Sequence, residues 1–294
     1  MPGDCEGSRP KHVNTVAIVG VGLIGGSFAR ALQQTGYAGR ILGVSSERTT
    51  REAMALGVIH EAVTLDEAAA RADLLFLAQP ILHLIDDLAK LQGKLKPGAL
   101  VTDGGSTKTR ICEAGRVLGS QFIGGHPMAG KEARGVQYAT GDLFRGCNWV
   151  LTPLDDADLS QPAAVWLRDR IQAFGSKLVV LKPEVHDRVV ASTSHLVQLL
   201  STSLAVTLAD VAEAPSVVGP AAIEMTRVAM SDFGMWADIF ATNPDAISEA
   251  LGRLIGNLQQ ARESLTDPAL RAIFEKAAAS AKRLRSPNVK NFET

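Results

Sequence analysis

Short apolar runs alternate with helix-like stretches from residue 15 to about residue 153. The helix-like stretches include SERTTREAMALG and HLIDDLAKLQGKL. This alternation predicts a mostly parallel sheet with helices on its faces, and runs that are apolar throughout indicate strands buried on both sides. The predicted strands are TVAIVG, RILGVS (40–45), ADLLFLAQP (72–80), ALVTDGG (99–105), FIGGHPM (122–128) and NWVLTP (148–153).

The pattern changes near residue 182. A further helical pattern, AAVWLRDRIQAFG, and one more strand, KLVVLKP (177–183), precede long helical segments rich in Ala, Leu, Ser and Glu. We therefore predict a doubly wound α/β domain over residues 1–182 and an all-α domain over residues 183–294. A chain of 294 residues is long enough for two cores.

Net charge and cysteine content indicate which classes of partner and site this protein lacks. The 30 basic and 31 acidic residues leave a net charge of -1, which gives no electrostatic footprint for nucleic acid or a membrane surface. We find no signal peptide and no apolar run long enough to span a bilayer, so we expect a cytoplasmic protein. Cys5, Cys112 and Cys147 have no C-x-x-C spacing, and neither a disulfide framework nor a zinc site is indicated.

A glycine-rich turn follows the first predicted strand. Gly20, Gly22 and Gly25 fit G-x-G-x-x-G between an apolar strand and a helix that begins with Leu23 and Ile24. The first glycine permits a tight turn, the second lets the backbone approach a pyrophosphate, and the third lets helix and strand pack closely. The context favours a Rossmann-type dinucleotide site over a bare strand-to-helix turn.

The end of the second strand bears on the choice between NAD and NADP. NAD-binding domains usually carry Asp or Glu there, whereas this chain has Ser45, followed by Ser46, Glu47 and Arg48. Hydroxyls and a guanidinium suit a 2′-phosphate, and Glu47 keeps NAD possible. The alternative for this stretch is a solvated loop.

Two later strand ends combine glycines with polar side chains. Ligands of open α/β sheets bind at the carboxyl ends of the strands, so the segments 103–108 and 124–130 are candidates for chemistry. His126, in the second segment, is a titratable group expected to border the nicotinamide. A turn histidine bonded to the backbone is an equally acceptable interpretation.

The first helix of the second domain begins with Pro183 at a position suited to the first helical turn. Regular helical spacing places His186 and His195 on roughly opposite faces, so a shared metal is not expected. Ser192 and Gln198 fall on the face of His195 at a spacing of three. That face is either a pocket wall or an interhelical contact.

Arg227 lies between apolar positions in IEMTRVAMSDFGMW rather than in a run of charges. An arginine in such a setting usually has a carboxylate partner. Asp232, Asp238 or an anionic substrate is the candidate partner.

Taken together, these motifs resemble the prephenate and arogenate dehydrogenases of tyrosine biosynthesis. The resemblance implies a Rossmann domain, a helical C-terminal domain that forms homodimers, and an active site in the cleft between them. It covers nearly the whole chain and is carried by VAIVGVGLIGGSFARAL, VTDGGSTK, FIGGHPMAGKEARGVQYA, HDRVVASTSHL, MTRVAMSD and MWADIF.

The resemblance implies an oxidative decarboxylation that converts prephenate to 4-hydroxyphenylpyruvate or arogenate to tyrosine, with hydride transfer to NAD(P)+. His126 matches the catalytic histidine, which accepts a hydrogen bond from the substrate hydroxyl while neutral. Activity is therefore expected to fall as the pH drops through the pKa of this histidine, which is about 6.5 if unperturbed. Ser106 matches a serine beside this histidine and the nicotinamide, Arg227 a carboxylate-binding arginine, and His195 a supporting pocket histidine.

The chain departs from the family pattern where the substrate side chain is expected. Gln198 replaces a second histidine in Ser-His-Leu-Pro-His, Lys131 replaces a common threonine, and residues 222–224 differ from Phe-Arg-Asp. These differences leave open the choice between prephenate and arogenate. Two rival interpretations are a two-domain dehydrogenase of the β-hydroxyacid type and a cofactor-binding sensor without catalysis.

Overall fold

The computed structural model describes residues 13–285, and its first half is built on two β-sheets. The larger sheet is entirely parallel and has the strand order β3-β2-β1-β4-β5. Its strands are β1 (Thr15–Val19), β2 (Arg40–Val44), β3 (Glu61–Ala62), β4 (Leu74–Leu77) and β5 (Leu100–Asp103).

A three-stranded sheet continues from the edge of the first one. It contains β6 (Ile123–Pro127), β7 (Asn148–Pro153) and β8 (Lys177–Val180), and a single bridge between Val101 and Phe122 connects the two sheets. All the predicted runs form strands. The prediction missed the two-residue β3, and β6 pairs with β7 antiparallel. No α-helix lies between β6 and β7 to supply the crossover that parallel strands need, so the chain returns in the opposite direction.

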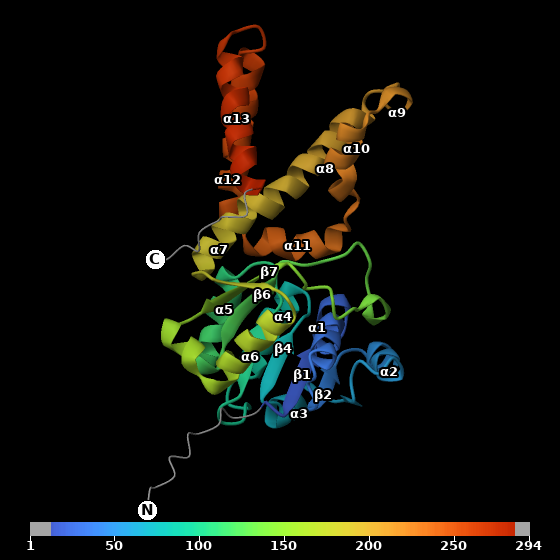
Figure 1. Cartoon of the computed structure of the whole chain (residues 1–294), viewed down its shortest axis with the longest axis vertical. Coiled ribbons are helices and arrows are strands. Elements are labelled where there is room, and N and C mark those ends of the chain that lie inside the picture. Colours follow the sequence, from blue (N-terminus) through green and yellow to red (C-terminus); the bar gives the residue numbers. More distant parts are fainter. Residues whose placement is uncertain (1–12, 286–294) are drawn as a thin grey trace, which may run out of the picture.

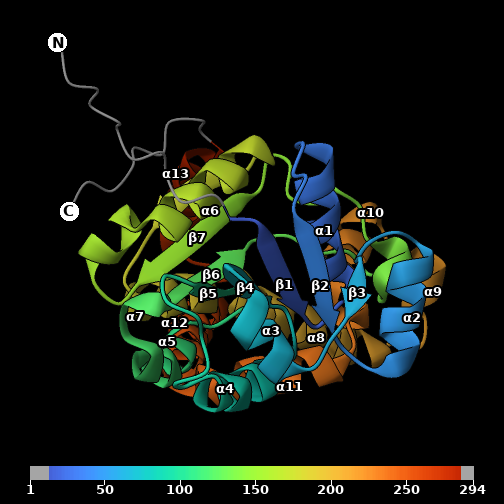
Figure 2. The ribbon, with the colours of Figure 1, turned by 90° about the horizontal axis from the view of Figure 1, so that it is seen from below.

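Helices cover both faces of the larger sheet, as in a doubly wound fold (Figure 2). Along β1, Val16 and Ile18 pack into the core on one face, and Ala17 and Val19 into the core on the other. The first core includes residues of α1 (Leu23–Gln34), α2 (Glu47–Ala55) and α6 (Pro162–Ala173), and the second residues of α3 (Leu65–Arg71), α4 (Ile81–Lys90) and α5 (Thr109–Gly115). Short 3-10 turns are η1 (Arg116–Gln121), η2 (Val136–Tyr138) and η3 (Asp156–Ser160).

Local sequence explains where several helices begin. Ser46 caps α2 by accepting a hydrogen bond from the Thr49 amide, and Thr64 and Glu67 form a capping box at α3. Proline occupies the first turn of α6 and, as predicted for Pro183, of α7.

The described residues after Val180 contain helices and no strand. In Figure 1, α8 and α10 project together from the α/β part, α12 and α13 form a second projection, and α11 lies across the junction. Trp236 of α11 and Ile247 of α12 pack into the same core as α4 and α5. The elements are α7 (Pro183–Val190), η4 (Ala191–His195), α8 (Leu196–Ala209), α9 (Ala214–Val217), α10 (Pro220–Thr226), η5 (Arg227–Met230), α11 (Phe233–Thr242), α12 (Pro244–Glu263) and α13 (Ala269–Arg285).

One long helix runs through α7, the π turn η4 and α8. By length and mean hydropathy alone, this helix over Pro183–Ala209 is long and apolar enough to cross a membrane, a property that core helices of soluble proteins share. The expectation of no membrane-spanning segment considered only uninterrupted apolar runs, whereas here polar residues are interspersed along 27 helical residues. Only 28% of its most apolar window is buried within the chain, so much of the helix is free to contact a partner.

Candidate active site

The glycine turn between β1 and α1 has two glycines that packing requires and one that it does not. Gly20 has a φ of +92°, and a Cβ there would lie 2.7 Å from the Ala78 carbonyl group. A Cβ on Gly25 would lie 2.2 Å from the Gly20 oxygen. A Cβ on Gly22 would meet no protein atom within 4 Å, so this position borders open space.

That open space lies at the N-terminus of α1. Gly22 is the N-cap, no side chain caps the helix, and its first turn carries no acidic residue. The amides of Leu23 and Ile24 in this turn therefore have no internal carbonyl partner, and the helix dipole favours an anion. A pyrophosphate fits this turn, and the residues present fit a dinucleotide.

In the loop after β2, the Arg48 guanidinium has no hydrogen-bond or ion-pair partner among the described residues. Ser45 and Arg48 are exposed, while the Ser46 hydroxyl is used as the cap of α2. The Glu47 carboxylate lies 2.5 Å from the Arg51 guanidinium. A shallow cavity of about 500 Å³ is lined by Arg48, Arg51, Glu52 and Ala55.

A buried ion pair joins the ends of β5 and β6. Lys108 and Asp103 have fully buried side chains and form a salt bridge. The other Asp103 oxygen accepts a hydrogen bond from the Gly125 amide at 2.9 Å, and Lys108 Nζ donates to the Gly125 carbonyl at 2.6 Å. Both sides of the Gly125 backbone are thus bonded, which positions the following residue, His126. Ser106, between Asp103 and Lys108, is half-buried.

His126 lies at the end of β6 and contacts a second histidine from the helical part. The ring has 8% of its surface exposed, and its Nδ1 lies 2.8 Å from Nε2 of His186. His186 is fully buried, and its Nδ1 lies 2.8 Å from Oδ1 of Asp187. Asp187 also accepts hydrogen bonds from the amides of Lys108 and Thr109, at 2.7 and 2.8 Å. The three side chains form a continuous chain from α7 to β6.

Burial and nearby cations keep these histidines neutral. Burial, together with His186, Lys108 and His195, holds the pKa of His126 well below its usual value of 6.5. The unperturbed histidine value of about 6.5 therefore does not apply to His126. Burial also lowers the pKa of His195 to about 4.

The prediction that His186 and His195 lie on opposite faces assumed regular winding between them. Five residues, Ala191–His195, form a π turn, which winds more loosely than the regular helix assumed for the prediction. Both histidines are buried near His126, and both lower its pKa. The Asn243 side-chain nitrogen lies 2.9 Å from the Asp187 carbonyl and 3.5 Å from Nδ1 of His195.

After the π turn, α8 carries buried polar groups without hydrogen-bond partners among the described residues, and so does α11. Gln198 is 6% exposed, and its Oε1 has no hydrogen bond, although its Nε2 donates to Thr202 at 3.2 Å. The Ser201 hydroxyl and the Trp236 indole nitrogen are buried and unpaired in the same way. Ser192, expected beside Gln198, instead accepts a hydrogen bond from Arg253 at 3.3 Å. Unpaired buried polar atoms are rare in folded proteins, and a ligand is one partner that would satisfy them.

Arg227, at the start of η5, contacts the segment that follows His126. Its Nη1 lies 3.2 Å from a Glu132 carboxylate oxygen, and its Nε lies 3.4 Å from Glu224. About half of its side chain is exposed, which leaves part of the guanidinium accessible. Neither Asp232 nor Asp238 is its partner.

Those two aspartates make other contacts. Asp232 pairs with Arg134 at 2.7 Å, and Asp238 accepts a hydrogen bond from the Leu82 amide. The Arg134–Asp232 pair and the Glu132–Arg227 pair both join the segment after β6 to the helical part. Lys131, in the same segment, is exposed and donates to Thr140 at 3.3 Å.

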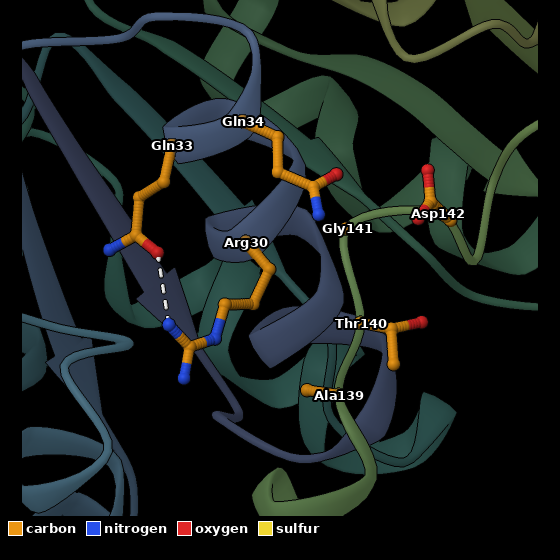
Figure 3. Close-up of a pocket in the computed structure, with 7 residues that line it drawn as sticks. All are labelled: Arg30, Gln33, Gln34, Ala139, Thr140, Gly141 and Asp142. Atoms are coloured by element: carbon orange, nitrogen blue, oxygen red, sulfur yellow. Dashed lines mark hydrogen bonds between the residues drawn. The ribbon is translucent and has the colours of Figure 1, made fainter.

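A surface pocket of about 610 Å³ has Thr140, the partner of Lys131, in its lining. Figure 3 shows it at the C-terminal end of α1, where Arg30, Gln33 and Gln34 face the segment 139–142. None of the residues that the sequence predicts for the site lines this pocket. The candidate site lies instead at the N-terminal end of α1 and the carboxyl ends of β5 and β6.

Sequence reasoning missed several residues that the structure places around His126. Asp103 and Lys108 bracket Ser106, and His186 and Asp187 are adjacent at the start of a helix. A carboxylate and a lysine five residues apart at a strand end are the signal that could have identified the ion pair. No local signal identifies Glu132 as the partner of Arg227.

The cysteines have no visible role in this arrangement. Cys112 is buried, burial raises the pKa of its thiol to about 11, and Cys147 is a half-buried free thiol. Cys5 lies outside the described residues.

Comparisons with known proteins match both parts of the chain. The family model described as "prephenate dehydrogenase, nucleotide-binding domain" matches residues 28–180, and the one described as "prephenate dehydrogenase, dimerization domain" matches residues 182–276. Prephenate dehydrogenase of Lactococcus lactis is 33% identical over 262 residues, which cover 85% of this chain and 71% of that protein.

Solved structures agree with the sequence comparison. Prephenate dehydrogenase of Aquifex aeolicus, in complex with hydroxyphenyl propionate and NAD+, has a TM-score of 0.84 and 28% identity. The match covers 94% of this chain and 100% of that one. Arogenate dehydrogenase of Synechocystis has a TM-score of 0.79 and 29% identity, covering 92% of this chain and 99% of that one. With two matching domain models and a relative aligned over most of both lengths, this chain belongs to the prephenate dehydrogenase family.

Proposed function

We propose that this protein catalyses the NAD(P)+-linked oxidative decarboxylation of prephenate, arogenate or both in tyrosine biosynthesis. The observation that carries the proposal is His126, a buried histidine kept neutral at the carboxyl end of β6. The ion pair that fixes His126 also joins β6 to β5, and the Gly104 position after β5 lies against Ile24 of the glycine turn.

NAD(P)+, when bound, would supply the hydride acceptor for the ring carbon that bears the hydroxyl, and the ring would lose carbon dioxide and become aromatic. Gly20, Gly22, Leu23, Ile24 and Gly25 would hold the dinucleotide. His126 accepts a hydrogen bond from the substrate hydroxyl and so stabilises the positive charge that develops as hydride leaves. Ser106, in the adjacent loop, orients the same hydroxyl. No net proton is released, because the hydroxyl of the aromatic product keeps its hydrogen.

The substrate is anionic, and Arg227 supplies the cation to bind it. A planar guanidinium is able to make two parallel hydrogen bonds to a carboxylate, for which Glu132 and Glu224 would otherwise compete. His195 and the unpaired Gln198 carbonyl face the substrate side chain, with Lys131 at the rim. We propose these as substrate-binding residues.

The direct test measures formation of reduced nicotinamide with prephenate and with arogenate, each combined with NAD+ and with NADP+. Turnover in any of the four mixtures supports the reaction, and the ranking gives the preferences. A folded protein that binds the cofactor but is silent in all four mixtures would overturn it and favour a sensor. A β-hydroxyacid-type dehydrogenase is disfavoured because no lysine lies between Lys182 and Lys276 to serve as its base.

The pH dependence follows from the lowered histidine pKa values. His126 stays neutral, and able to accept a hydrogen bond, well below pH 6.5. We therefore expect kcat/KM to be retained as the pH falls from about 7 to about 5.5, with the acid limb below the usual histidine range. A limb centred near pH 6.5 in the kcat/KM profile would contradict the burial argument.

Stability should fall with pH in the range where activity is retained. The unfolded chain binds protons on these histidines below about pH 6.5, whereas the folded chain does not. For His195, whose folded pKa is about 4, the free energy of unfolding should fall as the pH drops from about 6.5 to about 4. Urea titrations across this range measure it.

The loop after β2 predicts acceptance of NADP+. No carboxylate stands at Ser45, and Glu47 is paired with Arg51 while Arg48 is exposed. Ser45→Asp should raise KM for NADP+ about tenfold or more relative to NAD+, since like charges about 4 Å apart repel by ~1 to ~4 kcal/mol. Ser45→Asn is the uncharged control. An unchanged KM ratio in Ser45→Asp would show that this loop does not contact the 2′ position.

The helical part forms a dimerization domain by family, and we propose a cytoplasmic homodimer through these helices, with the domains divided at residue 182. The exposed apolar surface of the helix over Pro183–Ala209 and its neighbours would be covered by the second copy rather than by lipid. Exposed large apolar side chains there include Val206, Val217, Ile223, Met230, Phe233, Leu258, Leu265 and Phe274.

A further inference from the structure

We propose that His186, held by Asp187, is a positioning residue that fixes the tautomer of His126 and leaves Nε2 of His126 as the free acceptor. This inference rests on the proposed function of His126, and it adds the reason why one ring nitrogen rather than the other faces the substrate. Its geometric basis is the chain of two 2.8 Å contacts from Asp187 through His186 to His126.

The donor and acceptor roles in these two hydrogen bonds can be assigned in order, starting from the Asp187 carboxylate. Hydrogen bonds to an ionised carboxylate must be donated. Burial raises the pKa of Asp187, but the hydrogen bonds from His186, Thr109 and Lys108 outweigh it and lower this pKa, so Asp187 stays ionised. His186 must therefore carry its hydrogen on Nδ1. Because burial lowers the pKa of His186 as well, its Nε2 is bare and accepts the hydrogen bond from Nδ1 of His126. A neutral His126 then has a bare Nε2, which is the state that accepts from a substrate hydroxyl.

The opposite state of His186 would disable the site. A protonated His186 would donate from Nε2, His126 would accept at Nδ1, and its Nε2 would carry a hydrogen unable to accept from the substrate. Asp187 and Asp103 favour this protonated form, whereas burial and Lys108 oppose it. His195 also faces the pair and, like Lys108, lowers the pKa of His126. Burial and Lys108 together outweigh the carboxylates, so the neutral form holds.

Neighbouring groups hold Asp187, His186 and His126 in place. Asp187 accepts two backbone amides at the start of α5, and its own carbonyl accepts from Asn243 at 2.9 Å. The His186 side chain is fully buried. On the other side, Gly125 is bonded at both its amide and its carbonyl. The ring of His126 is thus constrained from its backbone and from Nδ1.

The first experiment reads the tautomer directly in the wild-type protein. Nitrogen-15 NMR of histidine-labelled protein distinguishes a bare ring nitrogen from a protonated one, and the signal missing in His126→Asn assigns the resonance. We expect a protonated Nδ1 and a bare Nε2 at pH 7. A bare Nδ1 on His126 would overturn the proposal. This reading needs no substrate, so it stands or falls independently of whether prephenate or arogenate is turned over.

Two variants then test the consequence for catalysis. His186→Leu removes the acceptor, and we expect kcat to fall by at least about tenfold, with ~10⁴-fold as the limit when a wrong tautomer is enforced. His186→Gln keeps a carbonyl acceptor and should recover most of the lost kcat. Melting temperatures verify that both variants fold. A positioning role would be contradicted by equal losses of kcat in folded His186→Leu and His186→Gln, or by no loss in either. A purely structural role of His186 would change stability and leave the tautomer of His126 in the NMR spectrum unchanged.

Discussion

His126→Asn should lower kcat by about 10²- to 10⁴-fold, the usual contribution of a positioned acid or base. Asparagine is similar in size, but its shorter side chain cannot bond His186 and also place an acceptor where Nε2 of His126 lies. The substrate hydroxyl therefore loses its hydrogen-bond acceptor. Burial of His126 at 8% exposure leaves little room for water to take its place. Initial rates with prephenate and arogenate measure the loss.

Cofactor binding separates this loss from a folding defect. The dissociation constant of the dinucleotide should change little, because the glycine turn at α1 does not contact this side chain. His83→Asn, at an exposed position on α4, is the matched control and should retain wild-type kcat. If His126→Asn turned over normally, the catalytic assignment would be wrong. If the wild-type protein bound nucleotide with no turnover, the sensor interpretation would gain support.

Lys108→Met should lower the free energy of unfolding by about 3–5 kcal/mol, the cost of removing one partner from a buried ion pair. The reason is that Asp103 would remain fully buried with its charge uncompensated. The Gly125 carbonyl would also lose its hydrogen bond from Lys108. Equilibrium denaturation in urea measures the change.

An exposed ion pair provides the comparison. Lys94→Met removes the partner of Asp66 at positions that are 44% and 69% exposed, and surface pairs contribute only about 0–1 kcal/mol. The double variant Lys108→Met with Asp103→Leu should be less destabilised than Lys108→Met alone, because it removes the unpaired charge. A loss below about 1 kcal/mol in Lys108→Met, as expected for a surface pair, would contradict the buried ion pair as a source of stability.

Local patterns were sufficient to predict most of the secondary structure. The apolar runs became strands because a strand buried on both faces excludes polar residues along its whole length, and β4 is buried at every position. Pro183 at the start of α7 and the glycine turn before α1 were equally predictable, since each depends on backbone geometry within a few residues. The antiparallel return of β7 was not predicted, because pairing direction depends on the path of the chain between strands.

By itself, the sequence determined the α/β and all-α halves, the dinucleotide turn and the family to which the chain belongs. The roles of His126, Ser106 and Arg227 stay predictions. Only the tertiary structure decided that His126 meets His186, 60 residues away, and that Arg227 meets Glu132, 95 residues away. Even within one helix, the sequence did not predict the π turn at Ala191–His195, which winds differently from a regular α-helix. Propensity and periodicity describe neighbours along the chain, whereas the charge state and hydrogen bonding of a buried histidine depend on groups that folding alone brings within contact.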